Sequence, residues 1–127
     1  MTRKVGLFAN LTILALIAFL APSGAALAHA VLERAEPSAG AVVRAAPAEV
    51  QLLFSEAVEP ALSRVQVVDQ AGRRADAGKV RVDPGNKRLL RVALQPNLAP
   101  GSYRVSWRVV SVDTHVIQGS YSFVVRP

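Results

Sequence analysis

The chain has 127 residues, with 15 basic and 9 acidic side chains, a net charge of +6 and no cysteine. The absence of cysteine excludes disulfides, thiolate metal sites and cysteine catalysis, so an exported domain of this size must rely on its core alone. The length allows one domain after a targeting segment, and the basic excess is too small to indicate a nucleic-acid-binding surface.

The N-terminal segment 1–28 is typical of a secretory signal peptide. It has a basic start, an apolar run over 5–20 and a Pro-Ser-Gly break followed by alanines. A membrane span needs about 20 predominantly apolar residues. This run is shorter and ends in helix-breaking residues, which favours export with cleavage over a retained anchor.

Two overlapping cleavage sites are present. Cleavage after Ala28 makes His29 the first residue of a mature 29–127 domain, whereas cleavage after Ala30 removes that histidine. The mature domain is expected in the periplasm or another compartment outside the cytoplasm. The mature domain would carry 13 basic and 9 acidic residues, because the removed segment contains two basic residues and no acidic one.

Short runs that alternate between apolar and polar residues follow, separated by turn-forming residues. In chain order they cover 49–55, 64–69, 79–83, 88–94, 101–111 and 120–125. About seven short strands at this spacing predict an all-β fold, a single immunoglobulin-like Greek-key β-sandwich. No stretch has the pattern of an amphipathic helix.

Two aromatic residues of the 101–111 run are expected to anchor the core. Tyr103 and Trp107 fall on the same face of that strand as Val105 and Val109. The segment "LAPGSYRVSW" is similar to the corner of immunoglobulin-like folds, where a tyrosine hydroxyl bonds back to the backbone.

A group of basic residues between 73 and 91 has two interpretations. The group is expected to be a solvated hairpin that protects a sheet edge, and the alternative is a surface for an acidic partner. Its members are Arg73, Arg74, Lys79, Arg81, Lys87, Arg88 and Arg91.

The second histidine lies in "SVDTHVIQG". On an extended segment Asp113 and His115 point the same way, and a carboxylate beside an imidazole is a reasonable metal-ligand pair. Asp-x-His also occurs by chance, so a hydrogen-bonded surface pair is the alternative.

A free N-terminal His29 would turn this pair into a copper site. Its α-amine titrates near 7.7 to 8.0 and, with the ring Nδ1, can chelate a metal. With His115 and Asp113 the donors are three nitrogens and one oxygen, a tetragonal set that Cu(II) prefers. Zinc prefers tetrahedral sites and Cu(I) prefers sulfur.

The chain also resembles the CopC-like periplasmic copper-binding proteins of the copper resistance group. The residues that carry this resemblance are "HAVLERAEPSAG", "APAEVQLLFSEAV", "LAPGSYRVSWRVVS" and "SVDTHVIQGSYSF". The resemblance implies a small β-sandwich, with His29, Asp113 and His115 at the Cu(II)-binding positions. It places Glu56 on a glutamate that the family has near the site, which suggests a supporting or axial role. The alternative is that Glu56 is a solvated carboxylate after a strand.

The resemblance further implies an exported copper carrier or buffer that passes its metal to an integral membrane copper protein of the CopD type. Two features depart from the family pattern. Val116 stands where a proline is common, and the stretch 70–83 contains no methionine or histidine. A second, methionine-rich Cu(I) site is therefore not expected.

Two other classes of function compete with the carrier. A copper monooxygenase also uses an N-terminal histidine, but it needs an open copper position and a broad substrate surface, and Asp113 would occupy one position. A metal-free adhesion or assembly domain is favoured if cleavage follows Ala30. No Ser/His/Asp or paired-carboxylate arrangement supports hydrolysis, so the chain is not expected to be an enzyme.

Overall fold

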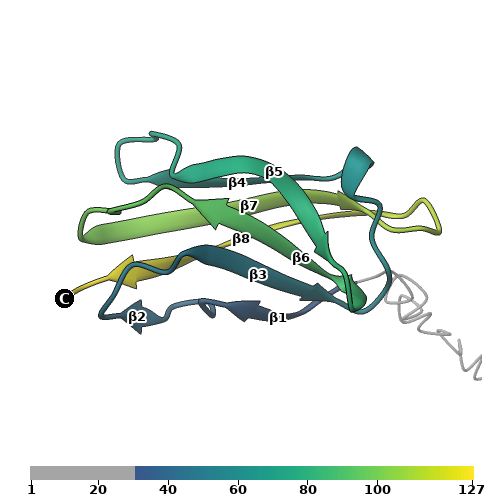
Figure 1. Cartoon of the computed structure of the whole chain (residues 1–127), viewed down its shortest axis with the longest axis horizontal. Helices are drawn as coiled ribbons and strands as arrows, with labels where there is room; N and C mark the ends of the chain where they lie inside the picture. Colours follow the sequence, from purple (N-terminus) through teal and green to yellow (C-terminus); the bar gives the residue numbers. More distant parts are fainter. Residues whose placement is uncertain (1–30) are drawn as a thin grey trace, which may run out of the picture.

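The computed structural model describes residues 31–127, which form two stacked four-stranded sheets (Figure 1). The first sheet has the order β1-β3-β6-β5 and the second has the order β2-β8-β7-β4. The elements are β1 (Leu32–Glu36), β2 (Val42–Val43), β3 (Glu49–Phe54), the short 3-10 helix η2 (Pro60–Leu62), β4 (Arg64–Asp69), β5 (Asp76–Asp83), β6 (Asn86–Leu94), β7 (Gly101–Val110) and β8 (Val116–Val125). The predicted all-β sandwich is confirmed.

The core lies between the two sheets and follows from the alternation in each strand. In β3 every second side chain is fully buried, and buried side chains alternate in the same way in the second half of β6 and in parts of β7 and β8. Phe54, Leu52, Leu90, Val105 and Phe123 are among the fully buried residues. An alternating strand buries one face only, so the opposite face of each sheet meets solvent.

The strand boundaries differ from the sequence prediction most clearly in the first two strands and at the starts of β5 and β8, while β3, β6 and β7 differ by one or two residues at one end. β1 and β2 were not among the predicted runs, β5 begins at Asp76 rather than Lys79, and β8 begins at Val116 rather than Ser120. β2 has only two residues and pairs in parallel with the end of β8, which no alternation in the sequence can reveal. Gly119 interrupts the apolar pattern of β8.

The two aromatic anchors differ in their burial. Tyr103 is buried, stacks on Phe123 and donates its hydroxyl to the carbonyl of Ala99, which confirms the predicted tyrosine corner. Trp107 is only partly buried and packs against the edge of the core, so its prediction as a core anchor was too strong. It lies directly over Gly119, which pairs with it across β7 and β8.

The basic group between 73 and 91 is mostly neutralised by carboxylates. Among the described residues five of its arginines form ion pairs, Arg73 with Asp69, Arg74 with Asp76, Arg81 with Glu49, Arg88 with Glu33, and Arg91 with Glu49 and Asp83. β5 is an edge strand, and Lys79 and Arg81 on it are exposed. The expectation of a solvated hairpin that protects an edge is confirmed.

Candidate metal centre

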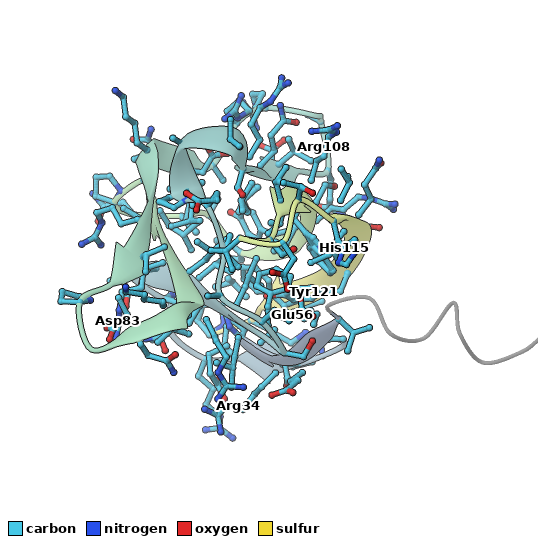
Figure 2. The ribbon with its side chains drawn as sticks, turned by 90° about the vertical axis from the view of Figure 1, so that its right-hand side faces the viewer. Arg34, Glu56, Asp83, Arg108, His115 and Tyr121 are labelled. Carbon is cyan, nitrogen blue, oxygen red and sulfur yellow. The ribbon has the colours of Figure 1, made fainter. Side chains whose placement is uncertain are left out.

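One end of the sandwich collects the sequence-predicted site residues that the structure describes. The β7–β8 loop, residues 111–115, carries Asp113 and His115, and the segment after β3 carries Glu56. We call this the His115 end. It faces the viewer in Figure 2, where His115 and Glu56 are labelled.

Ser111 shapes the loop that carries His115. Its side chain is fully buried, and its Oγ accepts a hydrogen bond from the His115 N–H at 3.2 Å. The Ser111 N–H donates to the His115 carbonyl at 2.9 Å, and the Ser111 carbonyl accepts from the Thr114 N–H at 2.9 Å. Three hydrogen bonds to one residue fix the backbone of this turn. His115 itself is half-buried.

Asp113 lies in the turn rather than on an extended segment. Thr114, the residue between Asp113 and His115, has a φ of 68°, in the left-handed region. Strand alternation does not hold through such a residue, so the argument that spacing alone aligns the two side chains was wrong. Asp113 is exposed at the tip of the loop.

The segment that carries Glu56 is bonded to the same loop. The Val112 N–H donates to the Ala57 carbonyl at 3.0 Å, and Val58 forms an isolated bridge with Ser111. Glu56 is half-buried, and its Oε2 is fully buried with no hydrogen-bond partner among residues 31–127. A buried carboxylate oxygen normally has a hydrogen-bond donor or a cation beside it. The role as a solvated carboxylate is therefore disfavoured.

The chain also enters the sandwich at this end. The Val31 N–H donates to Ser55 Oγ at 2.9 Å, and the Ser55 N–H donates to the Val31 carbonyl at 2.9 Å. His29 and the predicted signal peptide lie outside the described residues. Within 31–127 no three His, Cys, Asp or Glu side chains are grouped so that they could hold a metal.

Two aromatic side chains, Trp107 of β7 and Tyr121 of β8, line a groove beside β1. Trp107 and Tyr121 have ring centroids 5.9 Å apart, and Trp107 also meets Phe54 edge to face at 6.5 Å. The Trp107 Nε1–H and the Tyr121 hydroxyl are buried without a hydrogen-bond partner in the described part of the chain. Burial, and to a lesser degree the charge of Glu36, raises the pKa of Tyr121, so this hydroxyl stays neutral.

Ser55 and Ser111 are the site residues that the sequence prediction missed. Neither has a titratable or metal-binding group, and their role appears only in hydrogen bonds between segments distant in sequence. The one available signal was local, because a serine shortly before a turn commonly bonds to the backbone that follows. Asp113 and His115 were identified because their chemistry is visible in the sequence, and Glu56 was identified through the family resemblance.

The fold and this end of the molecule define a small β-sandwich with an imidazole and carboxylates at one end. The CopC domain family matches residues 32–126. The crystal structure of CopC from Methylosinus trichosporium OB3b has a TM-score of 0.72 and 38% identity, and covers 78% of this chain and 95% of that one. PcoC from Escherichia coli is described as a methionine-rich copper resistance protein. Its structure has a TM-score of 0.67 and 33% identity, and the match covers 77% of this chain and 99% of PcoC.

The chain therefore belongs to the CopC family. A longer relative is also similar, the copper transport protein CutJ of Bacillus subtilis (strain 168), with 32% identity over 96 residues. The match spans 76% of this chain but only 18% of that relative. Within residues 31–127 no helix has the length and apolar character that crossing a bilayer requires.

Proposed function

We propose that the chain is an exported copper carrier or buffer outside the cytoplasm, and that it binds one Cu(II) at the His115 end. The ligands in this proposal are the amine and imidazole of mature His29, the imidazole of His115 and the carboxylate of Asp113. The family relationship supports copper as the cargo, since two of the relatives above are named for copper transport and copper resistance.

The observation that carries the proposal is the attachment of the chain at Val31. Two hydrogen bonds hold Val31 to Ser55, and Ala57, two residues later, accepts from Val112 of the β7–β8 loop. His29 is two residues before Val31, so covalent geometry keeps their Cα atoms within about 7 Å. That distance supports a site shared between the N-terminus and the loop.

The donor set determines the oxidation state of the metal. Nitrogen and carboxylate donors in a tetragonal plane favour Cu(II), whereas Cu(I) is stabilised by sulfur. The one methionine of the chain is Met1, which belongs to the signal peptide, and there is no cysteine. The mature domain would therefore carry Cu(II) without a sulfur site for Cu(I).

Glu56 fits a supporting or axial position. Its buried Oε2 lacks a partner among the described residues, and it belongs to the segment that is bonded to the loop. A metal or the N-terminal ammonium would supply the missing positive charge. Outer contacts of this kind typically change metal affinity by about 10- to 100-fold.

The first experiment is the intact mass of the exported protein, followed by a Cu(II) titration against a competing chelator. We expect cleavage after Ala28, one Cu(II) per chain and weaker binding as the pH falls, because the amine and both imidazoles must lose protons. A protein that starts at Val31, or an affinity that is flat between about pH 8 and pH 5, contradicts the site.

Substitutions then separate the ligands. His115→Ala is expected to abolish tight binding while the circular dichroism of the fold is kept, since the residue lies in a loop. Asp113→Ala should weaken binding by about 10- to 100-fold if it is a supporting contact and by more if it is a ligand. Glu59→Ala is the matched control, an exposed carboxylate on the neighbouring segment. Tight binding by His115→Ala would remove the assignment.

The membrane copper protein of the CopD type stays a prediction from the resemblance. A carrier needs a partner that receives or supplies its metal, and such a partner must reach the His115 end.

A further inference from the structure

The outer face of the second sheet has an unusual charge distribution. Among the outward positions of β4, β7 and β8 are three exposed arginines, Arg64, Arg104 and Arg108, and no acidic residue. The other outward side chains are serines, glutamines and valines. We call this surface the arginine face.

Two of these arginines are direct cross-strand neighbours. Arg64 of β4 lies opposite Arg108 of β7 in the antiparallel register, and Arg108 lies opposite Gln118 of β8. Like charges directly opposite each other destabilise a sheet. Within residues 31–127 neither guanidinium has a carboxylate within ion-pair distance, in contrast to the five paired arginines near β5 and β6. Packing gives no reason for this pair.

The arginine pair lies beside the His115 end. Arg108 is two residues before Val110, which pairs with Val116 at the base of the β7–β8 loop, and Figure 2 shows Arg108 at the same end of the molecule as His115. Three exposed apolar side chains, Leu62, Val112 and Val116, lie on η2, in the loop and at the start of β8. Apolar side chains bordered by arginine are typical of protein interfaces.

The positive surface continues around the edge of the sheet. Arg64 borders a groove of 770 Å³ between β4 and β5, and the charged residues that line it are Arg64, Arg74 and Lys79. All three are cations, although Arg74 is paired with Asp76. A ligand in this groove therefore meets positive charge at Arg64 and Lys79, which are unpaired among residues 31–127.

We infer that the arginine face and the apolar side chains beside it dock a protein partner whose surface carries carboxylates around an apolar patch. Guanidinium groups bind carboxylates in a bidentate way, and serine and glutamine side chains add hydrogen bonds. A lipid surface is disfavoured because the exposed large apolar side chains in the described chain are valines and one leucine, without an aromatic anchor. The inference rests on the proposed function, in that docking here would place a copper-exchanging partner next to His115.

In the test, a capped peptide of alternating glutamate and leucine is titrated into the exported protein without metal. Binding is followed by ¹H–¹⁵N NMR of the protein. A glutamine–leucine peptide of the same length is the control. We expect shifts at Arg64, Arg108 and the β7–β8 loop that saturate with the acidic peptide only. Peptide binding should weaken as salt shortens the Debye length from about 10 Å at 0.1 M to about 3 Å at 1 M.

Charge reversal identifies the surface. Arg64→Glu and Arg108→Glu should each weaken peptide binding about tenfold or more, because the new carboxylate repels the glutamates of the peptide. Arg126→Glu is the matched control, an exposed arginine after the far end of β8. All three variants should keep the wild-type Cu(II) affinity, so a failure of docking is distinguishable from a failure of the copper site.

Three results would overturn the inference. The first is that the chemical-shift changes caused by the peptide are spread over β5 and β6, or persist in both charge-reversal variants. The second is that phosphatidylglycerol vesicles, and not the peptide, bind in an Arg64- and Arg108-dependent way, which would make the occupant a lipid. The third is a dimer in sedimentation velocity that either reversal dissolves, which would make the occupant a second copy of this chain.

Discussion

The contact between Gly119 and Trp107 gives the sharpest test of how β7 and β8 pack against the core. A Cβ added at Gly119 would lie 2.5, 2.9 and 3.2 Å from three atoms of the Trp107 indole. Favourable carbon contacts lie at about 3.5–4.0 Å. The indole cannot turn away freely, because its ring contacts Phe54 on one sheet and Tyr121 on the other. Gly119→Ala must therefore displace the ring or separate the strands.

We expect Gly119→Ala to lower the free energy of unfolding by about 1–3 kcal/mol, the usual cost of overpacking. For a domain of this size that corresponds to a fall in Tm of about 4–24 °C. Trp107 is the one tryptophan of the chain, so its fluorescence reports its own displacement. The emission should shift to the red as the half-buried ring becomes more exposed to water.

Gly85→Ala is the matched control. Its added Cβ would meet one side-chain oxygen of Asp83 at 3.4 Å, which is an ordinary contact. Its Tm should stay within about 4 °C of wild type or rise slightly, because alanine lowers the entropy of the unfolded chain. Trp107→Phe should recover part of the loss in the Gly119→Ala background, since the smaller ring leaves room for the methyl group. Wild-type Tm and emission in Gly119→Ala would refute this packing argument.

The remaining predictions concern the fold and the metal. Burial raises the pKa of Asp76, but the ion pair with Arg74 and the hydrogen bond from the Val67 N–H lower it further, so the net pKa lies below its ordinary value. This stabilisation is present above about pH 4 and is lost as the pH falls through the lower folded pKa. The urea midpoint of the wild type should therefore fall with acid, and that of Asp76→Asn should fall less. The substitution itself should lower the free energy of unfolding by about 1–3 kcal/mol. Tyr103→Phe removes the hydrogen bond to the Ala99 carbonyl and should cost about 0.5–1.5 kcal/mol in the same titration, whereas an unchanged midpoint would mean that water replaces this bond in full. Anaerobic reduction of the copper-loaded protein should release the metal to a Cu(I) chelator, and retention of Cu(I) would reveal a site outside the proposed ligand set.

The parts of the fold that the sequence predicts are those with a local pattern. β4 has both predicted boundaries, and β3 ends one residue earlier than predicted, because alternating apolar residues encode a half-buried strand. β1 carries charged residues at Glu33, Arg34 and Glu36, and its place in the first sheet depends on pairing with β3. Pairing between distant segments leaves no mark in a short window of sequence.

The same distinction explains what could be predicted of the charged surfaces. The crowded cations between 73 and 91 attract notice in the sequence, but the folded chain pairs most of them with carboxylates such as Glu49 and Asp83. Arg64 and Arg108 are unremarkable in the sequence and become neighbours only through the β4–β7 register. Local charge density is therefore a poor guide to where a sandwich presents uncompensated charge.

The candidate site combines fixed and adaptable parts, and this combination suits a carrier. The β7–β8 ladder runs without interruption to the Val110–Val116 pair. Ser111 then bonds to His115 twice, because its Oγ accepts from the His115 N–H and its own N–H donates to the His115 carbonyl, so the backbone that carries the imidazole is held in place. Asp113 lies at the exposed tip of the turn, where few contacts restrain it. In the proposed ligand set, His115 would hold the metal in position, while Asp113 at the exposed tip would be free to give way to a ligand from a docked partner without breaking the fold. Copper could then leave by stepwise ligand exchange at the face where we expect the partner to bind, and the core would stay packed throughout.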